Sequence, residues 1–287
     1  MLPAGARVAV VTPAGIPDPA RLAAGMALIS DWGLVPVPGA ALGQRHRYFA
    51  GDREARLADL RWALTAPDID AVWFGRGGSG TAQLLASLPL DSIDQRPIFG
   101  FSDATALFCA LGRRGRPVHA PVLHSLADGV DEASQRALQA WMAGAPSRLP
   151  GRWLCGPTEA VEAPVRGGNL CVLASLCGTP HALQAAGSIL LIEDIGEPPY
   201  KIDRLLRQLQ ASGALDGVVG VAVGELTGCA PPAGADWTVQ DMLIEVLQPL
   251  GVPVVVGLPV GHGRENHCFS LGAQARLHEG GLDVANR

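Results

Sequence analysis

The sequence predicts an α/β protein with an N-terminal parallel-sheet α/β domain and a C-terminal sheet-rich α+β domain. Three observations support this fold class. Short β-branched runs alternate with helical patterns in the first half, the pattern lapses at 143–159, and strands recur less regularly beyond it. Strand–helix alternation favours a parallel sheet covered on both faces. We therefore expect a domain at 1–142, a linker at 143–159 and a second domain at 160–287.

The elements of the first domain follow from changes in apolar periodicity. A buried strand at 7–11 ends before Pro13, and Pro19 then opens a helix that extends to residue 32. The remaining elements, in order, are a strand at 34–37, a charged helix at 52–64, a strand at 69–74, a helix at 81–88, a strand at 97–101 and a helix from about 103 to 112.

The second domain has fewer regular crossovers. Its helix at 200–211 has one apolar face, formed by Ile202, Leu205, Leu206 and Leu209. The other expected elements are strands at 160–165, 188–192, 218–223 and 252–256, helices at 169–176 and 239–247, and one or two short strands at 270–283.

Composition limits the classes of partner. With 48% hydrophobic and 17% charged residues among 287, the chain has enough apolar material for a large core. A net charge of -5 gives no electrostatic reason to expect nucleic acid or an anionic membrane as a partner. The sequence shows no signal-peptide pattern and no uninterrupted apolar stretch of membrane-spanning length. We expect a soluble cytoplasmic protein with no nucleic-acid and no membrane partner.

The six cysteines form no C-x-x-C pair, and several lie in apolar runs. This pattern is typical of buried thiols in a reducing compartment rather than of a disulfide framework or a zinc site.

Function in α/β sheets gathers where strands end and loops begin. The first such place is the Gly-rich turn at 75–80, Gly-Arg-Gly-Gly-Ser-Gly. It matches G-x-G-x-x-G, but it does not follow the first strand, and Asp91 and Asp94 precede a strand instead of ending one. Backbone N–H groups at such a turn can bind any anion. We rank oxyanion or carboxylate binding first, a plain turn second and dinucleotide binding third.

The second place is the turn at 100–105, Gly-Phe-Ser-Asp-Ala-Thr. Ser102 stands between a buried strand and a helix, which is the position of a nucleophile elbow, where the next N–H can join an oxyanion hole. Ala104 fills the last position of G-x-S-x-G, so the motif departs from the usual pattern. The competing interpretation is that Ser102 only caps the helix, and the local sequence by itself favours the cap.

Two further strand ends carry titratable side chains. Glu193 and Asp194 end an apolar strand, where carboxylates are costly unless they meet partners, so they have either an orienting or metal-binding role or begin a solvated loop. His262 lies between two glycines after the strand at 252–256. Ser102, Glu193 and His262 together supply a nucleophile, an imidazole orienter and a general base. Their spacing alone does not bring them together.

At these four places the chain resembles the serine LD-carboxypeptidases, the muramoyltetrapeptide carboxypeptidase family that also contains the microcin C immunity proteins. Each motif is short, but their common order argues against a chance match. The resemblance includes residues 12–15, 48–60, 76–80, 100–107, 167–170, 191–194 and 257–262.

The resemblance implies a role for each candidate. The nucleophile would be Ser102, the triad carboxylate Glu193 and the base His262, with oxyanion donors in the backbone N–H groups of Asp103 and Gly78. It further implies an active site between two domains, a homodimer, and no metal or organic cofactor. Peptidoglycan enzymes of this family release terminal D-alanine from murein tetrapeptide during cytoplasmic recycling. The expected partner is therefore a small murein peptide.

Two positions depart from the family pattern. Ser79 replaces an aromatic residue in the Gly-rich turn, and Arg166 stands where Trp is frequent. Both positions bear on the substrate pocket. The guanidinium of Arg76 or Arg166 could bind the terminal carboxylate of the substrate with two hydrogen bonds, and a surface role is equally open for each of these two arginines. The candidate substrate contacts are Arg76, Gly77, Arg166 and Asn169.

Two other functions stay open. The immunity branch cleaves aminoacyl or peptidyl nucleotide analogues, and its pockets must stack a nucleobase. The 5% aromatic content and Ser79 make this chain less suited to that task. A nucleotide-binding protein without catalysis, the more distant alternative, would rest on the Gly-rich turn alone.

Overall fold

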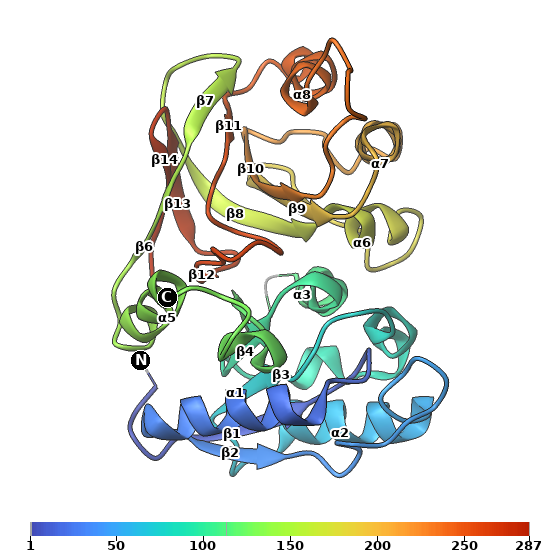
Figure 1. Cartoon of the computed structure of the whole chain (residues 1–287), viewed down its shortest axis with the longest axis vertical. Helices are drawn as coiled ribbons and strands as arrows, with labels where there is room; N and C mark the ends of the chain where they lie inside the picture. The colour runs from blue at the N-terminus through green and yellow to red at the C-terminus, as the bar shows by residue number, and fades with distance from the viewer. Residues whose placement is uncertain (1, 113, 287) are drawn as a thin grey trace.

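The computed structural model describes residues 2–112 and 114–286, and it arranges them around two sheets (Figure 1). The six-stranded sheet has the order β12-β5-β4-β3-β1-β2, and the eight-stranded sheet has the order β6-β14-β13-β8-β9-β10-β11-β7. In Figure 1 the first sheet and its helices occupy the lower half and the second sheet the upper half. The predicted fold class is confirmed.

The first sheet is parallel except at one edge. Its strands are β1 (Arg7–Val11), β2 (Val35–Pro38), β3 (Ala71–Phe74), β4 (Pro97–Gly100) and β5 (Arg116–His119), with β12 (Phe269–Ser270) antiparallel to β5. Strand order reverses between β1 and β3, and the crevice outside such a switch point is where open α/β sheets place their sites. The loops after β1, β3 and β4 therefore meet at one edge.

The helices of the first sheet begin where the sequence provides caps. Asp18 accepts the Arg21 N–H ahead of α1 (Pro19–Asp31), and Asp52 accepts the Ala55 N–H ahead of α2 (Arg53–Thr65). Such caps satisfy backbone donors that a helix start otherwise leaves unpaired. The remaining helices here are α3 (Thr105–Leu111), α4 (Leu123–Leu126) and α5 (Glu132–Met142).

The second sheet has a parallel centre and antiparallel flanks. The parallel strands are β8 (Val161–Asn169), β9 (Ile189–Ile195), β10 (Gly220–Thr227) and β11 (Val254–Val256). The antiparallel strands are β6 (Ser147–Pro150), β7 (Arg152–Cys155), β13 (Gln274–His278) and β14 (Gly281–Val284). Its helices are α6 (Leu170–Ser175), α7 (Pro199–Ala211) and α8 (Val239–Leu247).

Several elements differ from the sequence prediction. The stretch 143–159, expected to be a linker, contains β6 and β7, each with a single buried residue, so neither shows a strand-like apolar alternation. β12 lies in the expected second domain but pairs with the first sheet. The expected helix at 81–88 is instead two 3₁₀ turns, η1 (Thr81–Gln83) and η2 (Leu85–Ser87), between Gly80 and Pro89.

One apolar core joins the two sheets. It contains Phe74 and Leu107 beside the first sheet, and Val165, Leu191 and Leu271 beside the second. Because buried packing of this kind is dense, it fixes the two sheets relative to each other at the edge where the strand-end loops meet.

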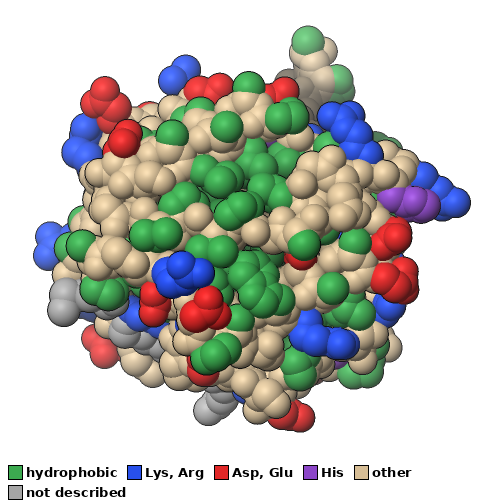
Figure 2. Space-filling model, turned by 90° about the horizontal axis from the view of Figure 1, so that it is seen from below, with side chains coloured by type: hydrophobic (Ala, Val, Ile, Leu, Met, Phe, Trp, Pro, Cys, Tyr) green, Lys and Arg blue, Asp and Glu red, His purple; other side chains and the backbone are tan. Residues whose placement is uncertain are grey.

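The surface mixes charges of both signs. Seen from below, acidic and basic side chains are interspersed, with apolar side chains toward the middle of the view (Figure 2). Among the described residues, no helix has the length and apolar character needed to cross a bilayer.

Candidate active site

The turn after β4 holds Ser102 in an unusual backbone conformation. Its φ is 58°, and Arg47 is the one other non-glycine with positive φ in the described chain. A residue with a Cβ is strained in this left-handed region, which occurs at sharp functional turns. Ser102 opens the 3₁₀ turn η4 (Ser102–Ala104), whose N-cap is Phe101, and no side chain caps η4 or α3. The helix-cap interpretation of Ser102 is therefore wrong.

A buried carboxylate and an imidazole face this edge from the second sheet. Glu193 on β9 is fully buried, and its Oε2 lies 2.7 Å from His262 Nδ1. Burial raises the pKa of Glu193, while the hydrogen bond and charge of His262 oppose the shift. When Glu193 accepts this hydrogen bond, the proton is on Nδ1, and Nε2 of that tautomer can act as an acceptor.

The His262 loop is held by groups that the sequence analysis missed. Asn266 Oδ1 accepts the Gly261 N–H at 3.2 Å and lies 2.9 Å from His119 Nε2. Burial lowers the pKa of His119 to about 4, so its ring is neutral and Nε2 donates. Phe101 lies with its ring centroid 4.8 Å from that of His262. His119 ends β5, so the strand-end rule could have found it.

The Gly-rich turn packs directly against the nucleophile turn. A Cβ placed on Gly77 would lie 3.1 Å from Ser102 Oγ, which is tighter than an ordinary van der Waals contact, so a side chain there would press on the nucleophile. The Gly15 N–H donates to the Gly77 carbonyl at 2.9 Å. In a trans peptide the N–H points opposite to the C=O. This hydrogen bond therefore turns the Gly78 N–H away from Gly15.

A pocket of about 240 Å³ collects most of the candidates, and we call it the Ser102 pocket. It is lined by Arg76, Gly77, Gly78, Ser102 and His262, among others. The five residues come from three separate strand-end loops of the two sheets. The arrangement brings a strained serine, an imidazole backed by a buried carboxylate, and glycine backbone to one place. This set of groups is suited to acyl transfer.

Comparisons with known proteins agree with this chemistry. Models of the LD-carboxypeptidase N-terminal and C-terminal domains match residues 8–120 and 162–277. The murein tetrapeptide carboxypeptidase of Pseudomonas aeruginosa is 36% identical over 289 residues, covering 96% of this chain and 94% of that protein. The chain belongs to the LD-carboxypeptidase family. The family resemblance is thereby confirmed, and the protein is a serine-type peptidase, hence a hydrolase.

Solved structures extend this likeness to the fold. Muramoyltetrapeptide carboxypeptidase from Oxalobacter formigenes superposes with a TM-score of 0.86 at 26% identity, covering 97% of this chain and 98% of that one. The microcin C7 self-immunity protein MccF superposes with a TM-score of 0.87 at 20% identity, covering 100% and 97%. The likeness to MccF concerns the fold alone.

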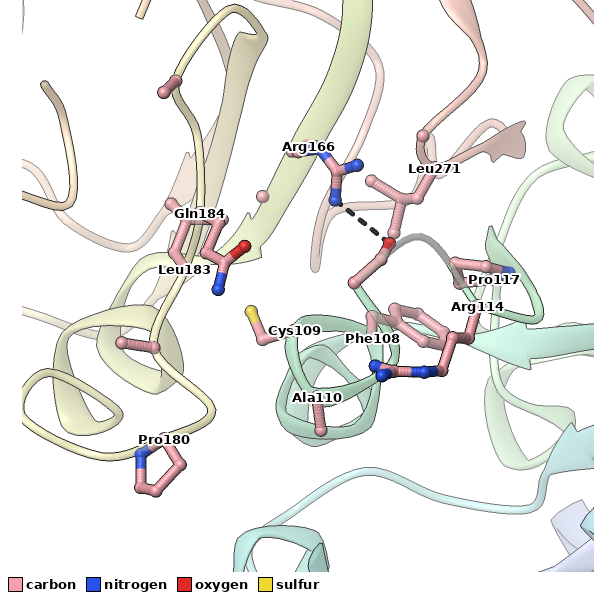
Figure 3. Close-up of a pocket in the computed structure, with 15 residues that line it drawn as sticks. Phe108, Cys109, Ala110, Arg114, Pro117, Arg166, Pro180, Leu183, Gln184 and Leu271 are labelled. Atoms are coloured by element: carbon pink, nitrogen blue, oxygen red, sulfur yellow. Dashed lines mark hydrogen bonds between the residues drawn. The ribbon is translucent and has the colours of Figure 1, made fainter. Parts of the chain in front are cut away.

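Arg166 lies apart from the other candidates. It lines a second pocket of about 630 Å³, the Arg166 pocket, with Phe108 and Cys109 of α3 and Gln184 opposite (Figure 3). Its Nη1 donates to the Gly112 carbonyl at 3.0 Å, at the C-terminal end of α3. Ser102 lies beyond the other end of this helix, whose seven residues alone span about 10 Å along the axis. Arg166 is only three residues from Asn169 in the sequence, and this closeness gave no sign that Arg166 lies away from the Ser102 pocket.

Asn169 also turns away from the Ser102 pocket, into the junction between the sheets. Its N–H donates to Thr105 Oγ1 at 3.1 Å and its Nδ2 to Asp194 Oδ1 at 3.0 Å. It is the register partner of Glu193 across β8 and β9. Asp194 accepts further from the Cys171 N–H. Asn169 and Asp194 thus brace the strand that carries Glu193.

His124 is a further residue that the sequence analysis missed. It lines the Ser102 pocket, and its Nδ1 accepts the Asp18 N–H at 3.2 Å. Burial lowers its pKa, and the charges of Arg21 and Arg76 act in the same direction.

In 2–112 and 114–286, no cluster of three or more His, Cys, Asp or Glu side chains could hold a metal ion.

Proposed function

We propose that this enzyme is a serine carboxypeptidase that hydrolyses an L,D-amide bond and releases terminal D-alanine from murein tetrapeptide, in peptidoglycan recycling. Ser102 is the nucleophile, His262 the general base and Glu193 the orienting carboxylate. The observation that supports this best is the 2.7 Å hydrogen bond between His262 and Glu193, beside a pocket that also contains the strained Ser102.

The proposed reaction depends on which nitrogen of His262 is free to accept the proton of Ser102. With Nδ1 bound to Glu193, Nε2 takes the Ser102 proton as Oγ attacks the carbonyl, and the carboxylate stabilises the imidazolium. The negative oxygen is bound by the N–H groups of Asp103 and Gly78. His262 then protonates the amine of the leaving D-alanine as the C–N bond breaks. Water, deprotonated by the same ring, cleaves the ester and restores Ser102.

Arg76 is the better of the two arginine candidates for the substrate's terminal carboxylate. It lines the Ser102 pocket, whereas Arg166 lines the other one. One Arg76 guanidinium nitrogen donates to the Ile16 carbonyl, which orients the side chain at the pocket. A guanidinium binds a carboxylate with two parallel hydrogen bonds, and that geometry favours cleavage of the terminal residue. Gly77 beside it allows the peptide to approach the backbone closely.

The test is D-alanine release from murein tetrapeptide by wild type, Ser102→Ala and Ser30→Ala. Ser30 is an exposed serine on α1 that donates to the Met26 carbonyl, so it controls for loss of a hydroxyl. Loss of a nucleophile costs at least about a thousandfold in rate. We expect that loss in Ser102→Ala and wild-type rate in Ser30→Ala. Wild-type rate in Ser102→Ala would overturn the proposal.

The substrate class can be separated in the same assay. Phe101 is the one Phe, Tyr or Trp side chain among the described residues that line the Ser102 pocket, and its ring lies against His262. A nucleobase therefore has little to stack on, and we expect a higher kcat/KM for murein tetrapeptide than for an aminoacyl-sulfamoyl adenosine. The reverse order would assign the enzyme to nucleotide-analogue cleavage.

The enzyme's assembly and location belong to the same proposal. The family resemblance supports a cytoplasmic homodimer. Light scattering should give about 60 kDa, twice the chain mass of 29.8 kDa. A mass near 30 kDa at micromolar concentration would contradict the dimer.

A further inference from the structure

The side chain of Asp103 has no part in the chemistry described so far, yet it is almost fully buried. It is 4% exposed, and its Oδ2 accepts the Thr81 N–H at 2.9 Å. The Gly80 N–H also interacts with it. Thr81 and Gly80 stand at the far end of the Gly-rich turn. The carboxylate therefore ties the nucleophile turn to the turn that carries Gly78.

A buried arginine holds the same end of the Gly-rich turn. Arg56 is 2% exposed, and its Nη1 donates to the carbonyls of Pro13 at 2.6 Å and Gly80 at 3.3 Å. Burial raises the pKa of Asp103 and lowers that of Arg56, while each charge favours the ionised form of the other. A buried charge is strongly unfavourable without such a partner. The charge of Arg56 therefore offsets part of the cost of burying the Asp103 carboxylate beside the turn.

The near end of the turn is held separately. The Gly15 N–H fixes the Gly77 carbonyl, as described above. Gly78 lies between this anchor and the one at Gly80 and Thr81. The position of the Gly78 N–H therefore depends on both anchors, and the second depends on Asp103.

We propose that the Asp103 carboxylate is a positioning residue for the oxyanion hole. It fixes the Gly78 N–H relative to the N–H of Asp103 itself, so a single residue supplies one donor and aligns the other. The inference rests on the proposed function, because it needs an oxyanion at this place. Alignment of donors matters most in the transition state, when the negative charge develops. Its loss should therefore lower kcat more than it raises KM.

The primary test compares Asp103→Asn with Asp59→Asn. Asp59 is also buried, at 6% exposure, and it accepts the N–H groups of Ala40 and Ala41 at 2.9 and 2.8 Å, outside the residues that line the Ser102 pocket. Both variants weaken a carboxylate that holds backbone N–H groups. For Asp103→Asn we expect a fall in kcat of about 10- to 100-fold with KM within about threefold. For Asp59→Asn we expect a lower Tm and kcat within about twofold of wild type.

A second pair of variants decides the matter if Asp103→Asn does not fold. A Cβ on Gly80, at φ +148°, would lie 2.6 Å from Arg56 Nη1 and push this end of the turn away. Gly43, at φ +90°, has no atom within 4 Å of an added Cβ. Both substitutions strain the backbone. Only Gly80→Ala should show the selective loss of kcat, and Gly43→Ala should not.

Two results would overturn the inference: kcat of Asp103→Asn within twofold of wild type, or an equal loss of kcat in Asp59→Asn. If Asp103→Asn does not fold, a wild-type kcat in Gly80→Ala would overturn the inference instead. The Ser102→Ala variant separates this inference from the proposed function. If Ser102→Ala is active, the proposed function fails. If it is inactive while Asp103→Asn is fully active, only the positioning role of Asp103 fails.

Discussion

The two pockets at either end of α3 differ in size and in what their walls contain. The Arg166 pocket has about 630 Å³ and is lined by Phe108, Cys109 and Gly167, among others, and no described non-glycine residue of this lining has a positive φ. The Ser102 pocket has about 240 Å³, and its walls include a serine at φ 58° and an imidazole backed by a buried carboxylate. Strain and buried charge, which are unfavourable unless compensated, mark a catalytic site better than volume does.

The largest effect on kcat should come from replacing Glu193, the carboxylate that lies behind His262 at the Ser102 pocket. Glu193→Gln keeps the shape but removes the charge that stabilises the imidazolium and selects the Nδ1-protonated ring. We expect kcat to fall by about 10³- to 10⁴-fold, as in other triads. D-alanine release measures it, and Glu245→Gln, an exposed glutamate on α8, serves as control. A loss below tenfold would mean that Glu193 does not orient His262.

The buried His119, which holds the His262 loop through Asn266, should make the free energy of unfolding depend on pH. In the unfolded chain a histidine takes up a proton near pH 6.5, whereas burial lowers the pKa of His119 to about 4. The unfolded state therefore binds more protons between these values, and stability falls as pH drops through this window.

The test compares the unfolding free energy of wild type and His119→Gln by urea titration. From pH 7 to pH 4, wild type should lose about 3 kcal/mol more than the variant. His46→Gln, which changes an exposed histidine, should lose as much as wild type. Parallel pH profiles for wild type and His119→Gln would show that His119 is not held neutral.

The smallest expected effect is a change in KM, and it is tested by replacing one arginine from each pocket. Arg76→Met should raise KM for murein tetrapeptide about 10- to 100-fold, because a charge-assisted hydrogen bond to the terminal carboxylate is lost. Arg166→Met should leave KM within twofold and lower Tm, since its bond to the Gly112 carbonyl joins β8 to α3. Equal KM effects in the two variants would remove the distinction between the pockets.

Strand ends were the most informative feature of the sequence. Ser102, Glu193 and His262 each follow a recognisable apolar strand, so residue type and position together identified them as candidates. β8 was predicted to stop at residue 165, yet it continues to Asn169 through Gly167 and Gly168. Glycines have low strand propensity, but here a side chain at Gly168 would collide with Thr105. Such a constraint comes from the neighbouring helix and cannot be inferred locally.

Other residues could not be predicted because their roles depend on contacts distant in sequence. His119 and Asn266 are 147 residues apart, and each alone resembles an ordinary core or loop residue. Asp103 was predicted to act through its N–H, but its side chain meets Thr81 across two turns. Arg166 was placed near the substrate by its neighbours in the motif, whereas its side chain points to the far end of α3 (Figure 3).

The most direct test of the central claim measures kcat/KM for D-alanine release in Ser102→Ala and Arg166→Met side by side. If catalysis takes place in the Ser102 pocket, Ser102→Ala loses at least about a thousandfold and Arg166→Met stays within about threefold of wild type. A Ser102→Ala enzyme near wild-type rate, or a larger loss in Arg166→Met, would contradict the account.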